Sequence, residues 1–153
     1  MSTIKVTSLI HSGSNLDPNI GLSAFGDVRI CRAITDKNGS NSSTPAQIEQ
    51  GRAKAWVHYD NKTSMSVLDS YNVDYVADNA TGEATVNFST AMANANYVVC
   101  GTTSESLTSS GHFDAINFHT FTTSAVDVES FGSADSPDTE KDNDINCVIV
   151  FGD

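Results

Sequence analysis

The side chains best suited to chemistry in this sequence are carboxylates, and they gather near its C-terminus. A polar stretch at residues 132–144 contains five of them, at Asp135, Asp138, Glu140, Asp142 and Asp144. Oxygen ligands of this kind suit Ca²⁺, so the stretch predicts either a weak divalent-cation site at a distal tip or a solvated acidic loop. The spacing lacks the central glycine and terminal glutamate of an EF-hand loop, and this favours the solvated loop.

The other residue types that carry chemistry form no motif. The four histidines, His11, His58, His112 and His119, have no mutual spacing typical of a metal site, which usually needs two or three convergent ligands. No nucleophile elbow, phosphate-cradling glycine loop or HExxH motif is present, and no two of the nineteen acids stand out as a catalytic pair. We therefore expect no catalytic residues, no metal ligands and no cofactor.

Charge is divided unevenly along the 153 residues, whose net charge is −11. Residues 1–62 contain seven of the eight Lys and Arg residues, whereas residues 63–153 contain one, Lys141, together with fourteen acids. Nucleic acid and anionic lipid both require cations that neutralise phosphate. We therefore expect neither as a partner, and an acidic, solvated surface on the second half.

The cysteines and the N-terminus bear on the compartment. Cys31, Cys100 and Cys147 each lie in an apolar run, which predicts buried free thiols, and an odd count argues against a disulfide framework. No basic-then-apolar leader and no apolar run approaching the length of a membrane span is present. We expect synthesis in a cytoplasm without a signal peptide, and no membrane insertion.

One stretch, residues 43–59, has unusually clear local signals. Thr44 precedes Pro45, and Gln47 follows three positions after Thr44, which is the spacing of a helix capping box. Gly51 is suited to end that helix in a left-handed conformation. From residue 53 to residue 59 apolar and polar side chains alternate, so a short helix near 45–51 is predicted to lead into a strand.

The remainder of the chain indicates strands and turns. Ser, Thr, Asn, Val and Gly are abundant, and short alternating runs recur at roughly ten-residue spacing. Gly82 is predicted to have a positive φ in a hairpin turn at 78–82, and Trp56 is interpreted as a core anchor. The fold class expected is all-β, an antiparallel, jelly-roll-like β-sandwich. The runs are residues 4–10, 20–24, 27–34, 65–68, 71–76, 83–89, 97–103, 115–123, 124–131 and 145–151.

Composition also predicts the domain organisation. Residues 35–43 contain no apolar side chain and read as a linker or exposed turn. We expect a small N-terminal β unit at residues 1–34 and the β-sandwich domain at residues 44–153.

Two longer segments carry a resemblance to a known family. Residues 39–57, GSNSSTPAQIEQGRAKAWV, and the hairpin region of residues 71–97 resemble small tail-fibre or virion-appendage proteins of marine bacteriophages, especially those that infect cyanobacteria. The opening MSTIKV and the apolar end at Phe151–Gly152 are also similar. The sequence departs from the family at residues 60–63, where DNKT replaces a more glycine-rich turn.

This resemblance implies a non-enzymatic virion protein that forms a homotrimer. Residues 1–34 would dock on other virion proteins, and the sandwich would be displayed for attachment to host-surface polysaccharide or protein. Two alternatives remain open. The first is a capsid knob, decoration protein or tail-apparatus component without receptor binding, and the second is a small polysaccharide-degrading enzyme, for which the residues offer no support.

The receptor contacts are expected in two polar loops, residues 104–112 and 132–144. Their hydroxyl, imidazole and carboxylate groups can hydrogen-bond to a host-surface glycan or protein. The candidate contact residues are Ser104, Glu105, Ser109, Ser110, His112, Ser133, Asp135, Asp138 and Glu140.

Overall fold

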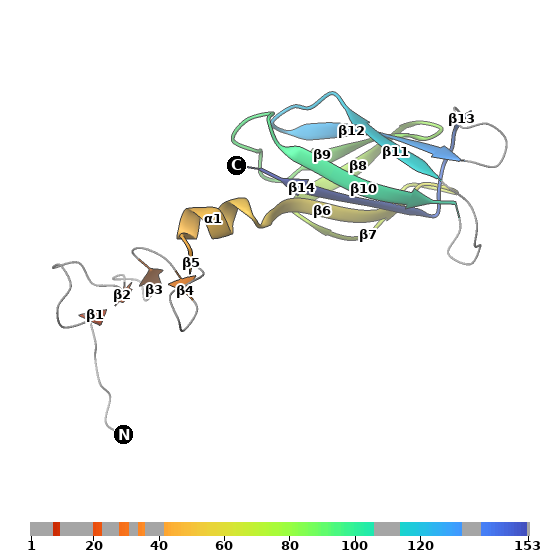
Figure 1. The fold of residues 1–153 in the computed structure, drawn as a ribbon. Coiled ribbons are helices and arrows are strands. Elements are labelled where there is room, and N and C mark those ends of the chain that lie inside the picture. Colours follow the sequence, from red (N-terminus) through yellow and green to blue (C-terminus); the bar gives the residue numbers. More distant parts are fainter. Residues whose placement is uncertain are drawn as a thin grey trace, which may run out of the picture. The chain divides into compact units, whose positions relative to one another are not determined.

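A computed structural model gives the fold as two compact units, Met1–Glu49 and Gln50–Asp153, which we describe separately (Figure 1). This division falls after the polar stretch that was expected to be a linker. The structure describes residues 42–105, 114–132 and 139–152, with short strands at 8–9, 20–22, 28–30 and 34–35.

The described strands of the first unit form two small antiparallel sheets. Strands β1 (Ser8–Leu9), β2 (Ile20–Leu22) and β3 (Val28–Ile30) pair in that order, which confirms the hairpin expected between residues 20 and 34. Strand β4 (Ile34–Thr35) pairs with β5 (Ser42–Ser43), so the two ends of the polar stretch are hydrogen-bonded to each other.

Helix α1 (Pro45–Gln50) begins with the predicted capping box. Thr44 Oγ1 accepts a hydrogen bond from Gln47 N at 3.2 Å, and Gln47 Oε1 accepts one from Thr44 N at 2.9 Å. These two bonds satisfy backbone donors that the helix itself leaves unpaired. The helix ends before Gly51 as expected, but the left-handed conformation predicted there is wrong. Among the described glycines only Gly82 has a positive φ, because the chain after Gly51 passes almost directly into a strand.

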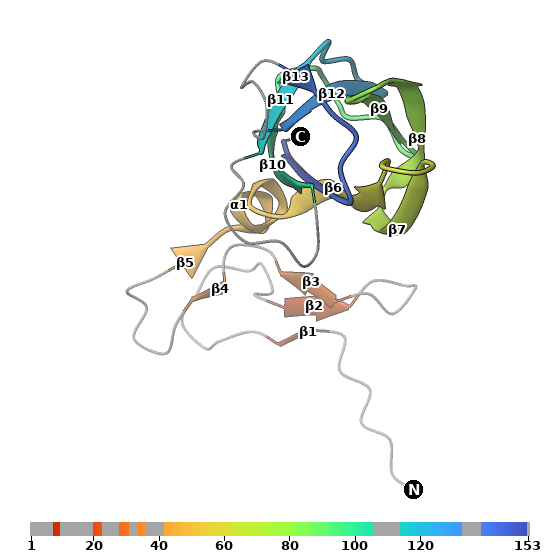
Figure 2. The ribbon, with the colours of Figure 1, turned by 90° about the vertical axis from the view of Figure 1, so that its right-hand side faces the viewer.

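The second unit is a β-sandwich, so the all-β antiparallel fold class is confirmed. One sheet has the order β10-β14-β6-β7 and the other β11-β12-β9-β8, with β13 paired to β12. Viewed along the strands, the two sheets enclose the core (Figure 2). Hairpins such as β6–β7 and β8–β9 keep consecutive strands within one sheet. The strands are β6 (Ala53–Asp60), β7 (Ser66–Tyr71), β8 (Val73–Ala80), β9 (Glu83–Phe88), β10 (Val98–Ser104), β11 (Ala115–His119), β12 (Ala125–Gly132), β13 (Thr139–Glu140) and β14 (Ile145–Phe151).

Most of the core comes from the four central strands, β6, β9, β12 and β14, and the rest from Val76, Met92 and Tyr97. The buried side chains of these strands alternate with more exposed ones, because every second residue of a strand points to the same face. Tyr59 and Val57 from β6 meet Val86, Val128 and Val150 from the other three strands, all at most 2% exposed. Burying each such valine contributes about 1.5–3 kcal/mol relative to an exposed one.

The edge strand β8 departs from the predicted pattern. Regular alternation in the predicted run 71–76 puts Val73 and Tyr75 on one face and Val76 on the other, but a register shift between Val73 and Tyr75 changes the alternation. Val76 is therefore 7% exposed and Tyr75 54% exposed. Gly82 has a φ of 73°, as predicted, although the strand continues to Ala80 and shortens the turn.

The burial expected for Cys100 and for Trp56 was wrong. Cys100 is exposed because it lies on the outward face of the edge strand β10. Leu68 lies in the strand expected near residues 65–68, and it is 58% exposed because β7 forms an edge of its sheet. Trp56 is half-buried on the outward face of β6 rather than in the core, since its neighbours Ala55 and Val57 point inward. Cys147 is half-buried, and Cys31 lies outside the described residues.

Candidate functional site

The bases of the two candidate loops meet at one end of the sandwich. Ser104 closes the β10–β14 ladder opposite Ile145, which places the first loop beside the segment that follows the second. The Glu105 carboxylate forms an ion pair with Lys141 Nζ at 2.6 Å, and this pair joins the two loop bases directly. We call this end, formed by Ser104, Glu105, Asp114, Lys141 and Asp144, the loop pole (Figure 1).

Further polar contacts hold the loop pole together. The Glu105 backbone N–H donates to Asp114 Oδ2 at 2.7 Å, and so closes the base of residues 106–113. Lys62, in the β6–β7 turn, donates from Nζ to the Glu105 carbonyl oxygen at 2.7 Å and pairs with Asp144 at 3.0 Å. Each partly exposed ion pair contributes at most about 1 kcal/mol, so the contacts act chiefly by fixing geometry.

A buried amide network lies beneath the loop pole. Asn143 Nδ2 donates to Thr103 Oγ1 at 2.7 Å, which in turn donates to Asn146 Oδ1 at 2.7 Å. Asn146 Nδ2 then donates to Asn61 Oδ1 at 2.9 Å. All four side chains belong to residues that are at most 6% exposed. Hydrogen bonds in such a low-dielectric setting are strong, so the ends of β6, β10 and β14 are fixed relative to one another.

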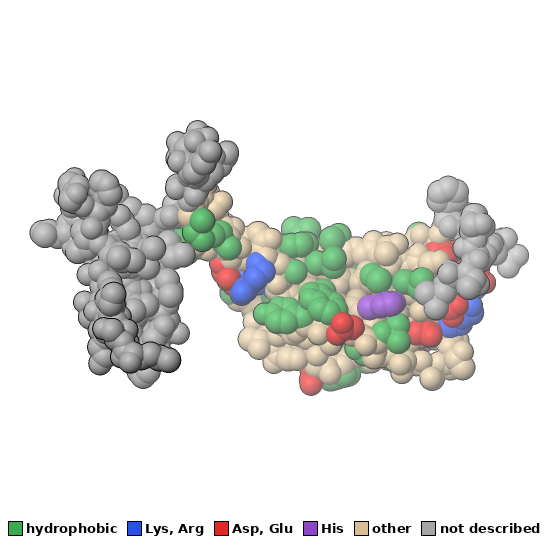
Figure 3. Space-filling view, turned by 90° about the horizontal axis from the view of Figure 1, so that it is seen from below, with side chains coloured by type: hydrophobic (Ala, Val, Ile, Leu, Met, Phe, Trp, Pro, Cys, Tyr) green, Lys and Arg blue, Asp and Glu red, His purple; other side chains and the backbone are tan. Residues whose placement is uncertain are grey.

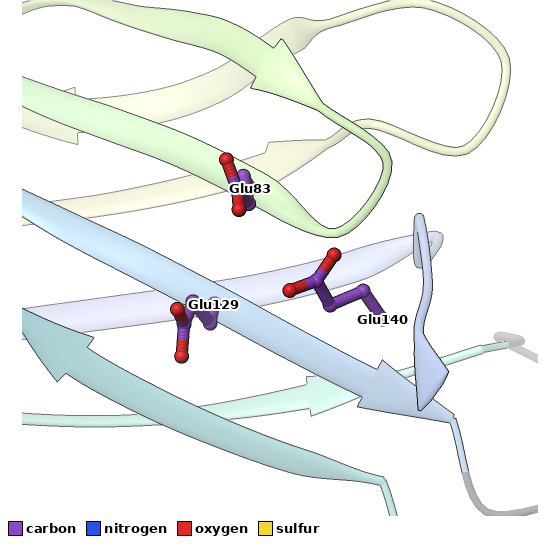
Figure 4. Close-up of side chains that lie close together, drawn as sticks. All are labelled: Glu83, Glu129 and Glu140. Atoms are coloured by element: carbon purple, nitrogen blue, oxygen red, sulfur yellow. The ribbon is translucent and has the colours of Figure 1, made fainter. Parts of the chain in front are cut away.

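Three carboxylates gather on the outer face of the second sheet (Figure 4). Glu83 and Glu129 are directly opposite each other on β9 and β12, and Glu140 reaches them from β13. One oxygen from each lies within 4.8 Å of the others. Glu129 also accepts a hydrogen bond from Asn117 Nδ2 at 3.1 Å, and His119 Nε2 lies 3.2 Å from it. These oxygens have the chemistry to hold a hard divalent cation, and without one they repel each other.

The three described acids of residues 132–144, Glu140, Asp142 and Asp144, do not converge on one position. Asp142 Oδ1 accepts hydrogen bonds from Asn61 Nδ2 at 3.2 Å and Gly82 N at 2.7 Å, so it fixes backbone. Asp144 pairs with Lys62, and Glu140 turns to the β9–β12 face. Each of the three described acids of this stretch therefore has its own partners at a different place. Asp135 and Asp138 lie outside the described residues.

The structure describes three of the nine candidate contact residues. Ser104 and Glu105 lie at the loop pole, whereas Glu140 belongs to the cluster of three glutamates. Sequence reasoning missed Lys62, Asp114 and Lys141 as the residues that fix the loop bases. The one available signal for these residues was that Lys141 is the only Lys or Arg in residues 63–153. Outside the described residues lie Ser109, Ser110, His112, Ser133, Asp135 and Asp138.

Shifted pKa values occur in the body of the sandwich. Burial raises the pKa of Tyr59 well above its usual range, and it also raises the pKa of the Cys147 thiol. Burial likewise raises the pKa of Tyr97, whose hydroxyl donates to the carbonyl oxygens of Thr122 at 3.0 Å and Ala125 at 2.8 Å. These shifts therefore belong to packing rather than to the loop pole.

Comparisons with known proteins assign no family to this chain. No family model, curated protein or solved structure matches the chain. Among the described residues, no helix is long and apolar enough to cross a membrane. The likeness to phage virion-appendage proteins therefore stays a prediction from the sequence.

Proposed function

We propose that this chain is a non-enzymatic structural protein of a bacteriophage virion, tail-fibre-like, which displays its β-sandwich for attachment to the host surface. The observation that supports this most is the loop pole, where the Glu105–Lys141 ion pair brings the bases of two polar loops together. Binding residues in display proteins commonly lie on loops that a rigid scaffold positions. The buried amide network under the loop pole supplies such a scaffold.

The remaining parts of the proposal concern assembly. The first unit, with residues 1–34, docks on other virion proteins, and the second unit faces solvent. Three copies of the chain form a homotrimer. Its partner on the host is a surface polysaccharide or protein. In solution, light scattering of the purified chain is expected to give three times the 16.2 kDa chain mass. A clean monomer at micromolar concentration contradicts the trimer.

Particle labelling tests the proposal directly. Gold-labelled antibodies raised against residues 50–153 should decorate purified virions at the tail, and particles made with a chain lacking residues 1–34 should lose the label. Label on the capsid surface instead would identify the chain as a knob or decoration protein. Intact virions that never contain the chain would overturn the proposal.

A further inference from the structure

A shallow depression lies at the end of the second unit opposite the loop pole, where β6 begins, β7 ends and β8 begins. Its volume is about 520 Å³, within the range of small-ligand sites. Tyr71, 49% exposed, forms one wall. The lining residues are Lys54, Tyr71, Asn72, Thr90, Ala91, Met92 and Ala93.

The depression is built on a fixed backbone clamp. Asn72 has a left-handed φ of 55°, a conformation that asparagine tolerates better than most residues. Its Oδ1 accepts from Thr90 N at 2.8 Å, while its Nδ2 donates to the carbonyl oxygens of Thr90 at 3.1 Å and Lys54 at 3.0 Å. Asn72 therefore acts as a positioning residue that ties the β7–β8 junction to β6 and to the segment after β9 around the depression.

The lining combines an aromatic surface with polar groups. Tyr71 lies opposite the half-buried Trp56 across the β6–β7 ladder, and hydrophobic side chains gather on this side of the unit (Figure 3). Lys54 brings an ammonium group and Thr90 a hydroxyl, which are able to hydrogen-bond to a ligand. Among the described residues, no carboxylate lines the depression.

We infer that this depression binds a pyranose ring of a glycan. Such a ring has an apolar face of C–H groups, which suits stacking on an aromatic ring, and a rim of hydroxyls that needs hydrogen-bonding partners. Tyr71 supplies the stacking surface, and Lys54 and Thr90 contact the hydroxyl rim. A site this shallow binds one sugar weakly, and several linked copies would bind a repeating polysaccharide far more strongly.

Nuclear magnetic resonance titration of the full chain tests the inference. The probes are cellotetraose, mannotetraose, galactotetraose and tetragalacturonate, each added to about 20 mM, which detects a millimolar Kd. At least one is expected to shift the backbone amide signals of Tyr71, Asn72 and Thr90. If none of the four moves these signals, the inference is wrong.

Two variants and a matched control test whether the sugar binds in the depression. Tyr71→Ala removes the stacking surface, and Ala91→Trp fills the depression without touching the clamp, so each should weaken binding at least about tenfold. Tyr75→Ala removes a similarly exposed tyrosine outside the lining and should change the affinity by less than about twofold. Should Tyr75→Ala weaken binding as much as Tyr71→Ala, or should Ala91→Trp leave it unchanged, the depression is not the binding site.

The inference stands apart from the proposed virion role, and the two fail separately. Virions without the chain would leave the titration result intact. Virions labelled at the tail, together with a titration in which no amide signal shifts, would contradict only the sugar site.

Discussion

The side-chain amide of Asn72 pairs with the backbone of Thr90 in both directions, accepting from its N–H at 2.8 Å and donating to its carbonyl oxygen at 3.1 Å. The side-chain amide thus makes the same pair of hydrogen bonds that the backbone of a neighbouring strand makes in a β-ladder. It lets the chain reverse from β7 into β8 while the segment after β9 stays attached.

Replacing Asn72 separates the two roles of this residue. Asn72→Ala loses both the hydrogen bonds and the tolerance of a left-handed backbone, so we expect it to lower the free energy of unfolding by about 1–3 kcal/mol. Asn72→Gly keeps the backbone conformation and should recover part of that loss. Urea unfolding followed by the fluorescence of Trp56, the only tryptophan, reports on the second unit. Equal stability of Asn72→Ala and the wild type would contradict the clamp.

The Glu83–Glu129 pair should destabilise the sandwich. Like charges directly opposite each other across two strands are unfavourable, and Glu140 adds a third. Glu83→Gln is therefore expected to raise the free energy of unfolding by about 0.2–1 kcal/mol in EDTA. Asp69→Asn, on a different sheet and outside the cluster, serves as the charge-matched control.

Calcium then tests whether the cluster holds a cation. A rise in Tm with millimolar Ca²⁺ in the wild type, absent in Glu83→Gln, would show that the three carboxylates form a binding site. A solvated cluster gives no such rise in either protein. Loss of stability in Glu83→Gln in EDTA would refute the expected repulsion.

High pH should destabilise the second unit through Tyr59. Because burial raises its pKa in the folded state, the native protein keeps the phenolic proton where the unfolded chain has lost it. Its stabilising contribution is complete below about pH 10 and falls by up to about 1.4 kcal/mol per pH unit above it. Stability curves for the wild type and Tyr59→Phe, measured between pH 8 and pH 11.5, should diverge only above about pH 10. Parallel curves across that range would show that ionisation of Tyr59 does not cause the loss of stability.

Thiol reactivity should distinguish the two described cysteines. Cys100 is exposed on β10, whereas Cys147 is half-buried and burial raises its pKa, which lowers its thiolate fraction. In a Cys31→Ser background, a chromogenic disulfide reagent is expected to react rapidly with one thiol and slowly with the second. Cys100→Ser should remove the fast phase, and a fast phase that survives this change would contradict the assigned exposure.

The features that the sequence could predict depend on near neighbours in the chain. The capping box at Thr44 and Gln47 is a three-residue signal, and the alternation in β6 and β9 follows from strand geometry alone. Gly82 was predictable because few residue types accept a positive φ.

The errors arise where a distant strand decides the environment. An apolar run places Cys100 in a strand but gives no sign that this strand forms the edge of its sheet. The shift at Val73 and Tyr75 arises from pairing with β9. The cluster that joins Glu83, Glu129 and Glu140 is non-local in the same way, since 57 positions separate Glu83 from Glu140.

The turn at Gly82 sets where this sandwich can accept sequence variation. A Cβ there would lie 2.6 Å from Lys141 N and 2.7 Å from the Ser130 carbonyl oxygen, and the Gly82 carbonyl oxygen accepts from Ser130 N at 2.8 Å. Any other residue would push Lys141 away from Glu105. A library that diversifies the loops for new targets must therefore hold Gly82 constant, because this residue is buried against Ser130 and Lys141 at the tip of its hairpin.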